Sequence, residues 1–164
     1  MFLKSIGATA AFSLAISSPV QSQGVVMVRD VSYDMALIMA QTAIEHCRQD
    51  NFKVGVSVVD RGGHVLVTLR DHGAAHHTVE LAQRKAYTAR IFRQTSKEFS
   101  QRLRDNPISA GLGTTSGVLA SVGGLPIKVG DEVIGGIGVS GAPGGDRDEA
   151  CARAGLAKVA DQLK

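Results

Sequence analysis

The first regular pattern in the chain is an apolar residue at every third or fourth position after Ser32. The positions are Tyr33, Leu37, Ala40, Ile44 and Cys47. This is the period of one face of an α-helix, and serine is a residue type that caps helix N-termini. The pattern therefore predicts a helix that runs from Ser32 to about Asp50.

The period then changes to two, which is typical of β-strands. Valine occupies every second position at Val54, Val56 and Val58, and the alternation returns at Val65, Val67 and Leu69. Residues 60–63, with the sequence Asp-Arg-Gly-Gly, have the composition of a tight turn. The two runs together predict an antiparallel β-hairpin.

Three more helices follow from the pattern. One is expected over 78–92, and a short one begins at Thr95, where Thr95 and Glu98 have the spacing of a capping box. The last helix begins at Asp146, and Asp146 with Glu149 has the same spacing. This helix is expected to bury Ala152, Leu156, Val159 and Leu163.

Two or three more strands are expected between these helices, over 118–122, 125–129 and 132–140, and we count all three in the predicted order. Gly130 and Asp131 form the turn between the last two strands, and Pro126 indicates an edge strand or a strand start. Residues 111–117 are rich in Gly, Ser and Thr and predict a flexible loop. The order α-β-β-α-α-β-β-β-α predicts one α/β (α+β) domain, in which hairpin-linked strands form an antiparallel sheet flanked by helices.

The N-terminus has the three-part pattern of a secretory signal. Residues 1–4 carry one positive charge, residues 5–17 are apolar and small, and Pro19 precedes a small residue at Ser22. The apolar run is too short to cross a bilayer, which takes about 20 residues. We therefore expect cleavage after Ser22, export to the periplasm or the medium, and one mature domain over 23–164. No other stretch of the sequence predicts membrane insertion.

Composition narrows the classes of partner. The chain has 18 basic and 15 acidic residues, and one of the basic residues, Lys4, lies in the predicted signal. The charges are interspersed, and the chain has two Tyr and no Trp. A nearly balanced surface with few aromatic residues argues against a nucleic-acid partner, which needs a basic face and stacking side chains.

The two cysteines, Cys47 and Cys151, lie in the first and last predicted helices. In an oxidising compartment they could form a disulfide that ties the ends of the domain together. Alternatively, both are small buried apolar residues on helix faces, and this is the interpretation that we prefer from sequence.

One glycine motif suggests chemistry that its context does not support. Residues 136–141 match the dinucleotide fingerprint G-x-G-x-x-G, but no further strand follows the last helix, as a Rossmann unit requires. Ser140 is followed by Gly141 and Ala142, so the second glycine of a nucleophile elbow is missing as well. We expect these glycines to let the strand lie against closely packed neighbours.

A histidine cluster is the strongest candidate site. His72, His76 and His77 surround the start of the second helix, close to Arg70. Imidazole is a ligand for haem iron and for zinc, and an arginine can pair with a propionate or another carboxylate. His76 and Glu80 are four residues apart, so both could face one metal ion. A solvated histidine-rich loop is the alternative.

Several segments, in order and with natural spacing, carry a family resemblance. They are residues 58–70, 80–89, 123–126, 134–141, 145–148 and 152–155. Over about residues 30–163 the chain resembles the GlcG/HbpS-like family. The resemblance implies a profilin-like fold with a five-stranded antiparallel sheet, homo-oligomers, haem binding, and haem or iron sensing beside a membrane sensor protein. A related domain ends some corrinoid adenosyltransferases.

The resulting hypothesis is an exported, non-enzymatic haem-binding protein that acts in storage, protection or sensing. His72, His76 and His77 would ligate the haem, Arg70 would engage a propionate, and the Gly123-Gly124 turn would allow close approach. The alternative is an enzyme or binding protein for a small organic acid, with Arg70 and Lys85 on the carboxylate and a histidine as general base. A third hypothesis is an oligomer whose surface recognises a sensor domain.

Overall fold

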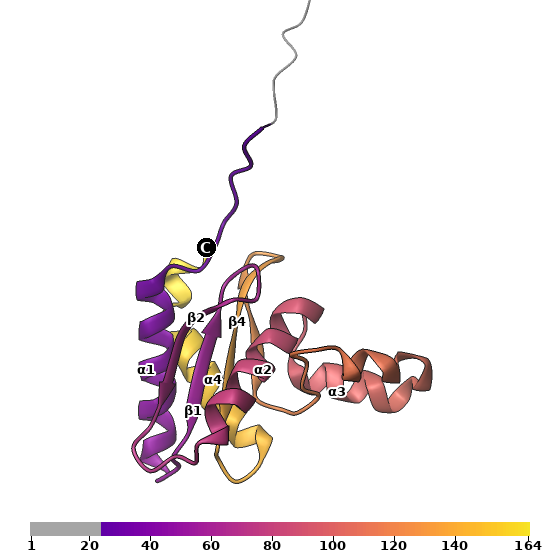
Figure 1. Cartoon of the computed structure of the whole chain (residues 1–164). Coiled ribbons are helices and arrows are strands. Elements are labelled where there is room, and N and C mark those ends of the chain that lie inside the picture. The colour runs from indigo at the N-terminus through magenta and orange to yellow at the C-terminus, as the bar shows by residue number, and fades with distance from the viewer. Residues whose placement is uncertain (1–23) are drawn as a thin grey trace, which may run out of the picture.

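A four-stranded antiparallel sheet lies at the centre of the fold (Figure 1). The structure is a computed structural model that describes residues 24–164, so the predicted signal over 1–22 lies outside the described residues. The strands are β1 (Gly55–Val59), β2 (Val65–Arg70), β3 (Gly124–Val129) and β4 (Glu132–Ser140). Their order in the sheet is β2-β1-β4-β3, so β2 and β3 are the edge strands.

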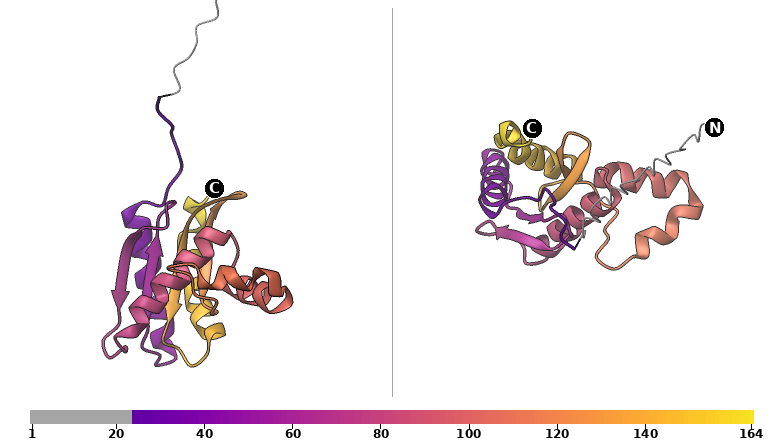
Figure 2. Two further views of the ribbon diagram at one scale, coloured as in Figure 1. Left: turned by 45° about the vertical axis from the view of Figure 1, so that its right-hand side comes forward. Right: turned by 90° about the horizontal axis from the view of Figure 1, so that it is seen from above.

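Helices cover both faces of this sheet. Two of them, α1 and α4, pack together on one face, and α2 crosses the other (Figures 1 and 2). The helix that follows, α3, extends sideways from the sheet together with a 3₁₀ segment (Figure 2). The helices are α1 (Tyr33–Gln49), α2 (His77–Phe92), α3 (Ser96–Asp105) and α4 (Gly145–Lys158), with 3₁₀ segments at Pro107–Thr114 and Ala160–Gln162. None of the helices in the described part of the chain is long and apolar enough to span a bilayer.

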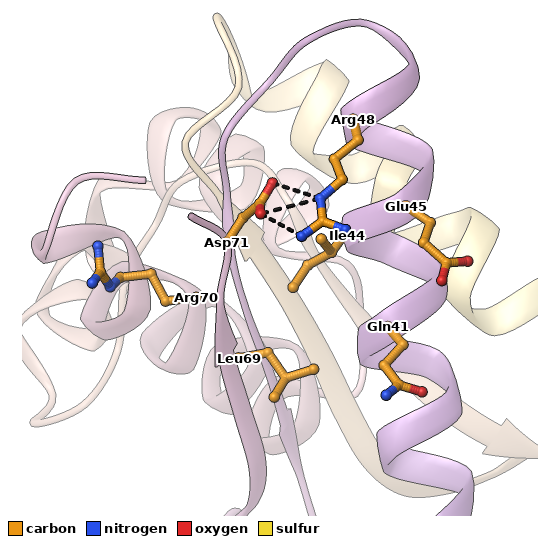
Figure 3. A pocket seen from close by; sticks show the side chains of 7 residues that line it. All are labelled: Gln41, Ile44, Glu45, Arg48, Leu69, Arg70 and Asp71. Carbon is orange, nitrogen blue, oxygen red and sulfur yellow. Dashed lines mark hydrogen bonds and ion pairs between the residues drawn. The ribbon is translucent and has the colours of Figure 1, made fainter. Parts of the chain in front are cut away.

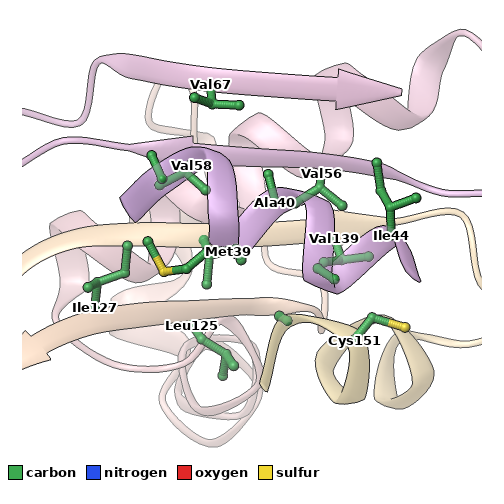
Figure 4. Close-up of a cluster of buried hydrophobic side chains, with 14 of the residues drawn as sticks. Met39, Ala40, Ile44, Val56, Val58, Val67, Leu125, Ile127, Val139 and Cys151 are labelled. Atoms are coloured by element: carbon green, nitrogen blue, oxygen red, sulfur yellow. The ribbon is translucent and has the colours of Figure 1, made fainter. Parts of the chain in front are cut away.

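The main core lies between the sheet and the α1–α4 pair (Figure 4). Alternating valines of the β1–β2 hairpin point into it, because successive side chains of a strand face opposite ways. Side chains from all four strands and both helices meet there, including Met39, Ala40, Val56, Val58, Val67, Leu125, Ile127, Val139 and Cys151. The predicted apolar face of α1 is rotated slightly, since Ala36 and Ala43 are buried whereas Tyr33 is 60% exposed.

Glycines lie at the points of the opposite face of the sheet that α2 approaches most closely. A Cβ atom at Gly138 would be 2.1 Å from the Ala82 carbonyl oxygen, and one at Gly136 would be 2.3 Å from the Ala86 carbonyl oxygen. A Cβ atom at Gly124 would be 2.2 Å from the Lys85 carbonyl oxygen. These glycines therefore let a helix backbone rest directly on two strands, as expected from the glycine motif.

Several local predictions are confirmed. Ser32 caps α1 by accepting a hydrogen bond from the Met35 amide at 3.2 Å. The β1–β2 hairpin forms, α2 has the expected extent, and Thr95 and Glu98 form the capping box of α3. Pro126 lies in an edge strand.

The prediction of a strand over 118–122, and with it a five-stranded sheet, is wrong for the described chain. The backbone groups of this segment form hydrogen bonds with side chains of α2. The Leu119 amide donates to Thr88 Oγ1 at 2.8 Å, and the Val118 carbonyl accepts from the Arg84 guanidinium at 2.9 Å. The Ser121 amide donates to the Leu119 carbonyl in a tight turn. These bonds tie the segment to α2, so it cannot join a strand ladder.

Two smaller predictions also differ from the structure. Most of the expected loop over 111–117 belongs to the 3₁₀ segment that begins at Pro107. The expected capping box at the start of α4 is absent from the described chain, where Gly144 occupies the cap without a side-chain bond. The Asp146 carboxylate instead pairs with Lys97 at 2.7 Å.

Cys47 and Cys151 form a disulfide, which corrects our preferred interpretation of them as separate residues. Cys47 lies in the last turn of α1 and Cys151 in α4, and both are buried where the two helices pack. Their Cα atoms are 5.6 Å apart, within the normal range for a disulfide. The bond joins positions 104 residues apart in the sequence.

From the close contact between α2 and β4 we predict that a side chain at Gly138 destabilises the fold. In Gly138→Ala, the new methyl group would overlap a helix carbonyl that cannot move without shifting α2. We expect the free energy of unfolding to fall by about 1–3 kcal/mol or more, as for other overpacked cores. Urea denaturation measures this change. Gly111→Ala is the matched control, because a Cβ atom there meets nothing within 4 Å, and an equal effect of both substitutions would contradict the close packing.

Candidate functional site

The loop between β2 and α2 carries the three clustered histidines. His72 lies in the loop, His76 is the residue before α2, and His77 is the first residue of the helix. All three side chains are exposed. Arg70, the last residue of β2, is exposed beside them. The structure therefore brings these four predicted site residues together on one short connection.

Asp71 anchors this loop to α1. Its carboxylate is buried and receives hydrogen bonds from Arg48 Nη2 at 2.6 Å and from Arg48 Nε at 3.0 Å (Figure 3). The same carboxylate accepts the His72 amide at 2.7 Å. Hydrogen bonds from the Arg48 guanidinium hold the pKa of the Asp71 carboxyl below its ordinary value, against the opposing effect of burial. The first histidine of the cluster is thus fixed through its own backbone.

Further backbone bonds complete the loop. The Asp71 amide donates to the Val54 carbonyl at 2.9 Å, and the Ala74 amide donates to the Asp71 carbonyl at 3.1 Å. The Arg70 guanidinium donates to the Ala74 carbonyl. Gly73 has a φ of +81°, a left-handed conformation that favours glycine. With its backbone groups paired in this way, the loop presents its histidines from a defined framework.

A cavity of about 380 Å³ lies beside this loop, between α1 and β2. Its lining residues are Gln41, Ile44, Glu45, Arg48, Leu69, Arg70 and Asp71. Leu69 and Asp71 point toward α1, whereas the Arg70 side chain turns to the other side of β2 (Figure 3). The volume is within the range of small-molecule pockets, about 300–1,000 Å³.

Gly123 and Gly124 lie far from the histidines within one chain. Gly124 begins β3, which is the opposite edge of the sheet from β2, and Gly123 is the residue before it. Both are buried, and a Cβ atom at either position would meet atoms of Lys85, Asp148, Val139 or Ser96. Their role in haem binding stays a prediction, and in one chain the predicted site is divided between two edges.

Lys85 is part of a buried ion pair. Its ammonium nitrogen is 2.7 Å from Asp148 Oδ2 and donates to the Val139 carbonyl at 2.9 Å. Asp148 also accepts the Ala142 amide at 2.9 Å, and burial raises the pKa of its carboxyl while Lys85 opposes this rise. Because Lys85 is only 3% exposed, it has almost no surface to offer a ligand. The expectation that Lys85 binds a substrate carboxylate is therefore wrong.

His76 and Glu80, the predicted metal pair, both lie at the start of α2 with exposed side chains. Glu80 Oε1 is 3.5 Å from Arg84 Nη1. Within residues 24–164, no group of three or more His, Cys, Asp or Glu side chains is placed to hold a metal ion. Metal binding by these two residues stays a prediction.

The residue that sequence reasoning missed is Arg48. It lies 23 positions before Asp71, on the last turn of α1. No local pattern marks this pair. One signal could have suggested an acidic partner at the end of β2. The first helix is expected to pack beside the hairpin, and it has a basic residue in its last turn.

Comparison with known proteins identifies the relatives of this chain. A family model described as "Haem degrading protein HbpS-like" matches residues 31–157. Protein GlcG of Escherichia coli strain K12 is 30% identical over 111 residues, which is 67% of this chain and 81% of GlcG.

Two crystal structures are similar over most of the chain. A double mutant of HbpS from Streptomyces reticuli is 37% identical with a TM-score of 0.78, covering 86% of this chain and 96% of that one. The structure titled as a PduOC–heme complex is 28% identical with a TM-score of 0.69, covering 78% of this chain and 94% of that one. Both confirm the fold over the greater part of the chain.

The anchoring role of Asp71 predicts a pH-dependent loss of stability in Asp71→Asn. The pKa of Asp71 is lower in the folded chain, so its ionised form adds stability above the unfolded value of about 3.9. This contribution is lost as the pH falls through the folded value. We therefore expect the variant to have a lower urea midpoint than the wild type at pH 7, and the difference to shrink in acid.

The matched control is Asp131→Asn, in the exposed turn before β4, where no ion pair involves the carboxylate within residues 24–164. Equal urea midpoints for the wild type and Asp71→Asn at pH 7 would refute the assignment of Asp71 as the loop anchor.

Proposed function

We propose a haem-binding function for this chain, which belongs to the HbpS-like family. The observation that carries the proposal is the anchored loop with three exposed imidazoles and an exposed guanidinium beside them. Membership of the family and similarity to a protein crystallised with haem support it.

The donor set of this loop fits haem. An imidazole nitrogen is a common axial ligand of haem iron, and the loop offers three of them on one exposed surface. Arg70 Nη1 donates to the Ala74 carbonyl, and no ion pair involves Arg70 within the described residues. Its remaining donors are suited to a propionate. We assign iron ligation to His72, His76 or His77 and propionate binding to Arg70.

The biological role that we propose is binding without chemistry on the haem, in storage, protection or sensing. Haem would supply the iron, and the chain would supply its axial imidazole ligand and the charged contact to a propionate. Gly123 and Gly124 could contribute only from a second subunit, because they lie on the other edge of the sheet from the histidines. We therefore propose a homo-oligomer as the binding form, with a membrane sensor protein as its partner.

We further propose that the chain is exported. The Cys47–Cys151 disulfide supports export, since disulfides persist in oxidising compartments such as the periplasm and are rare in the cytosol. The pattern of residues 1–22 supports it independently.

The haem proposal predicts a saturable shift of the Soret band when hemin is titrated into the purified chain. Replacing His72, His76 and His77 together with alanine should abolish the shift, because the iron would lose its protein ligand. Three single variants then identify the axial residue. His64→Ala is the matched control, since His64 is an exposed histidine on the β1–β2 turn, outside the loop.

The titration tests haem binding and its assignment to the histidine loop separately. A full Soret shift in the triple variant would refute the assignment to the loop while leaving haem binding in place. A wild type without any saturable shift would refute haem binding itself. It would favour the organic-acid alternative, which a thermal-shift screen with small hydroxy acids and dicarboxylic acids in the cavity beside β2 would then test.

Export predicts the mass and the thiol state of the chain made in a Gram-negative host. The periplasmic fraction should contain a chain that begins at residue 23, with no thiol reactive to maleimide after denaturation. A variant lacking residues 2–22 should stay in the cytoplasm with both cysteines reduced. Recovery of the unprocessed, reduced chain from cells that carry the full sequence would contradict the proposal.

A further inference from the structure

An exposed apolar arm precedes the first helix. Val25, Val26, Met27 and Val28 are 84%, 77%, 91% and 56% exposed. The other large apolar residues exposed in the described chain are isolated along the sequence. Contiguous exposed apolar surface of this kind marks an interaction site rather than ordinary protein surface. The run is also rich in β-branched residues, which favour an extended strand.

The root of this arm is fixed to the sheet. Asp30 accepts a hydrogen bond from the Arg61 amide at 2.8 Å, on the turn between β1 and β2. The Arg29 carbonyl accepts from the Arg61 guanidinium at 3.3 Å, and Val31 is buried against β4 near Gly135. From this root the arm leads away from the body of the protein, as the indigo segment in Figure 1 shows.

The sheet has two open edges, and they differ in their protection. Proteins discourage strand addition at an edge with proline and with exposed lysine. The β3 edge has both, in Pro126 and Lys128. The β2 edge has neither: the strand reads Val-Leu-Val-Thr-Leu before its final Arg70, and Val65 is 42% exposed. Thus β2 offers an unprotected row of backbone donors and acceptors.

The arm and this edge match in length and chemistry. A strand rises about 3.3 Å per residue, so the arm over 24–28 spans about 16 Å and the six-residue β2 about 20 Å. Strand addition would pair the free backbone of the arm with the free backbone of the edge, and would bury valine against the partly exposed Leu66 and Val65.

We propose that the arm of one copy adds as a strand to the β2 edge of a second copy. The arm leads away from its own sheet at the root, which favours the β2 edge of a second copy over its own. Reciprocal exchange about a two-fold axis would cover both arms and both β2 edges, which gives a closed dimer with no open β2 edge. In this dimer, each copy supplies the arm that covers the β2 edge of the other copy.

Cross-linking between two differently tagged chains tests this proposal. One chain carries Val26→Cys in the arm, and the other carries Thr68→Cys on β2; both positions are exposed. The native cysteines are buried and joined, so they will not react. After mixing and treatment with a flexible bismaleimide, we expect a covalent dimer that contains both tags. The matched control replaces Thr68→Cys with Lys128→Cys on β3 and should give at most a tenth of that product.

The other outcomes overturn the proposal. No mixed dimer, or an equal yield with the β3 control, would exclude addition to β2. A chain that carries both Val26→Cys and Thr68→Cys distinguishes its own edge from a partner's: a product of monomer mass alone would show that the arm folds back. Light scattering gives an independent measurement, in which deletion of residues 24–28 should halve the mass of the wild-type dimer, and an unchanged mass would also refute the proposal.

Discussion

Contact between the backbone of α2 and the bare face of the central strands is the constraint on which the rest of the structure depends. Gly136 and Gly138 have no side chain to separate β4 from the helix, so α2 approaches the sheet more closely than side chains would allow. That proximity places the backbone carbonyl of Lys85 over Gly124 of β3. It also brings the Lys85 ammonium group to Asp148 of α4. One helix is thereby attached to the sheet and to the far layer at once. The N-terminus of the same helix carries His76 and His77, so its position also determines where the candidate site lies.

The position of the candidate site also follows from the packing of helices on both faces of the sheet. Its histidines occupy the connection from an edge strand to α2, while Arg48, which holds Asp71, comes from α1 on the other face of the sheet. The loop is therefore tied to both layers. A buried carboxylate that receives a guanidinium and a backbone amide is well satisfied, and charge-assisted bonds of this kind are stronger than neutral ones. The arrangement anchors the backbone of a polar, solvent-facing loop and leaves its imidazoles exposed.

Sequence patterns predicted those parts of the fold that local forces determine. The β1–β2 hairpin, the cap of α1 and the capping box of α3 are confirmed, because each depends on residues close together in the chain. The expected strand over 118–122 failed because contacts to Thr88 and Arg84, about thirty residues away, take its backbone groups. The histidine loop was found from its composition, whereas its anchor at Arg48 and the pairing of Lys85 with Asp148 join distant positions that have no shared pattern. For the same reason, the sequence alone did not decide whether Cys47 and Cys151 form a disulfide.

That bond has a topological effect on the unfolded chain. It encloses all four strands, α2 and α3 in one covalent ring, whereas most of α1 and the second half of α4 lie outside the ring. A cut in any surface connection between the two cysteines, such as the laterally projecting 3₁₀ segment, would leave both fragments joined and their shared core in register. A machine that degrades proteins by threading a single strand would have to draw two strands through its pore at this point. We therefore expect the intact ring to hinder processive degradation until the disulfide is reduced.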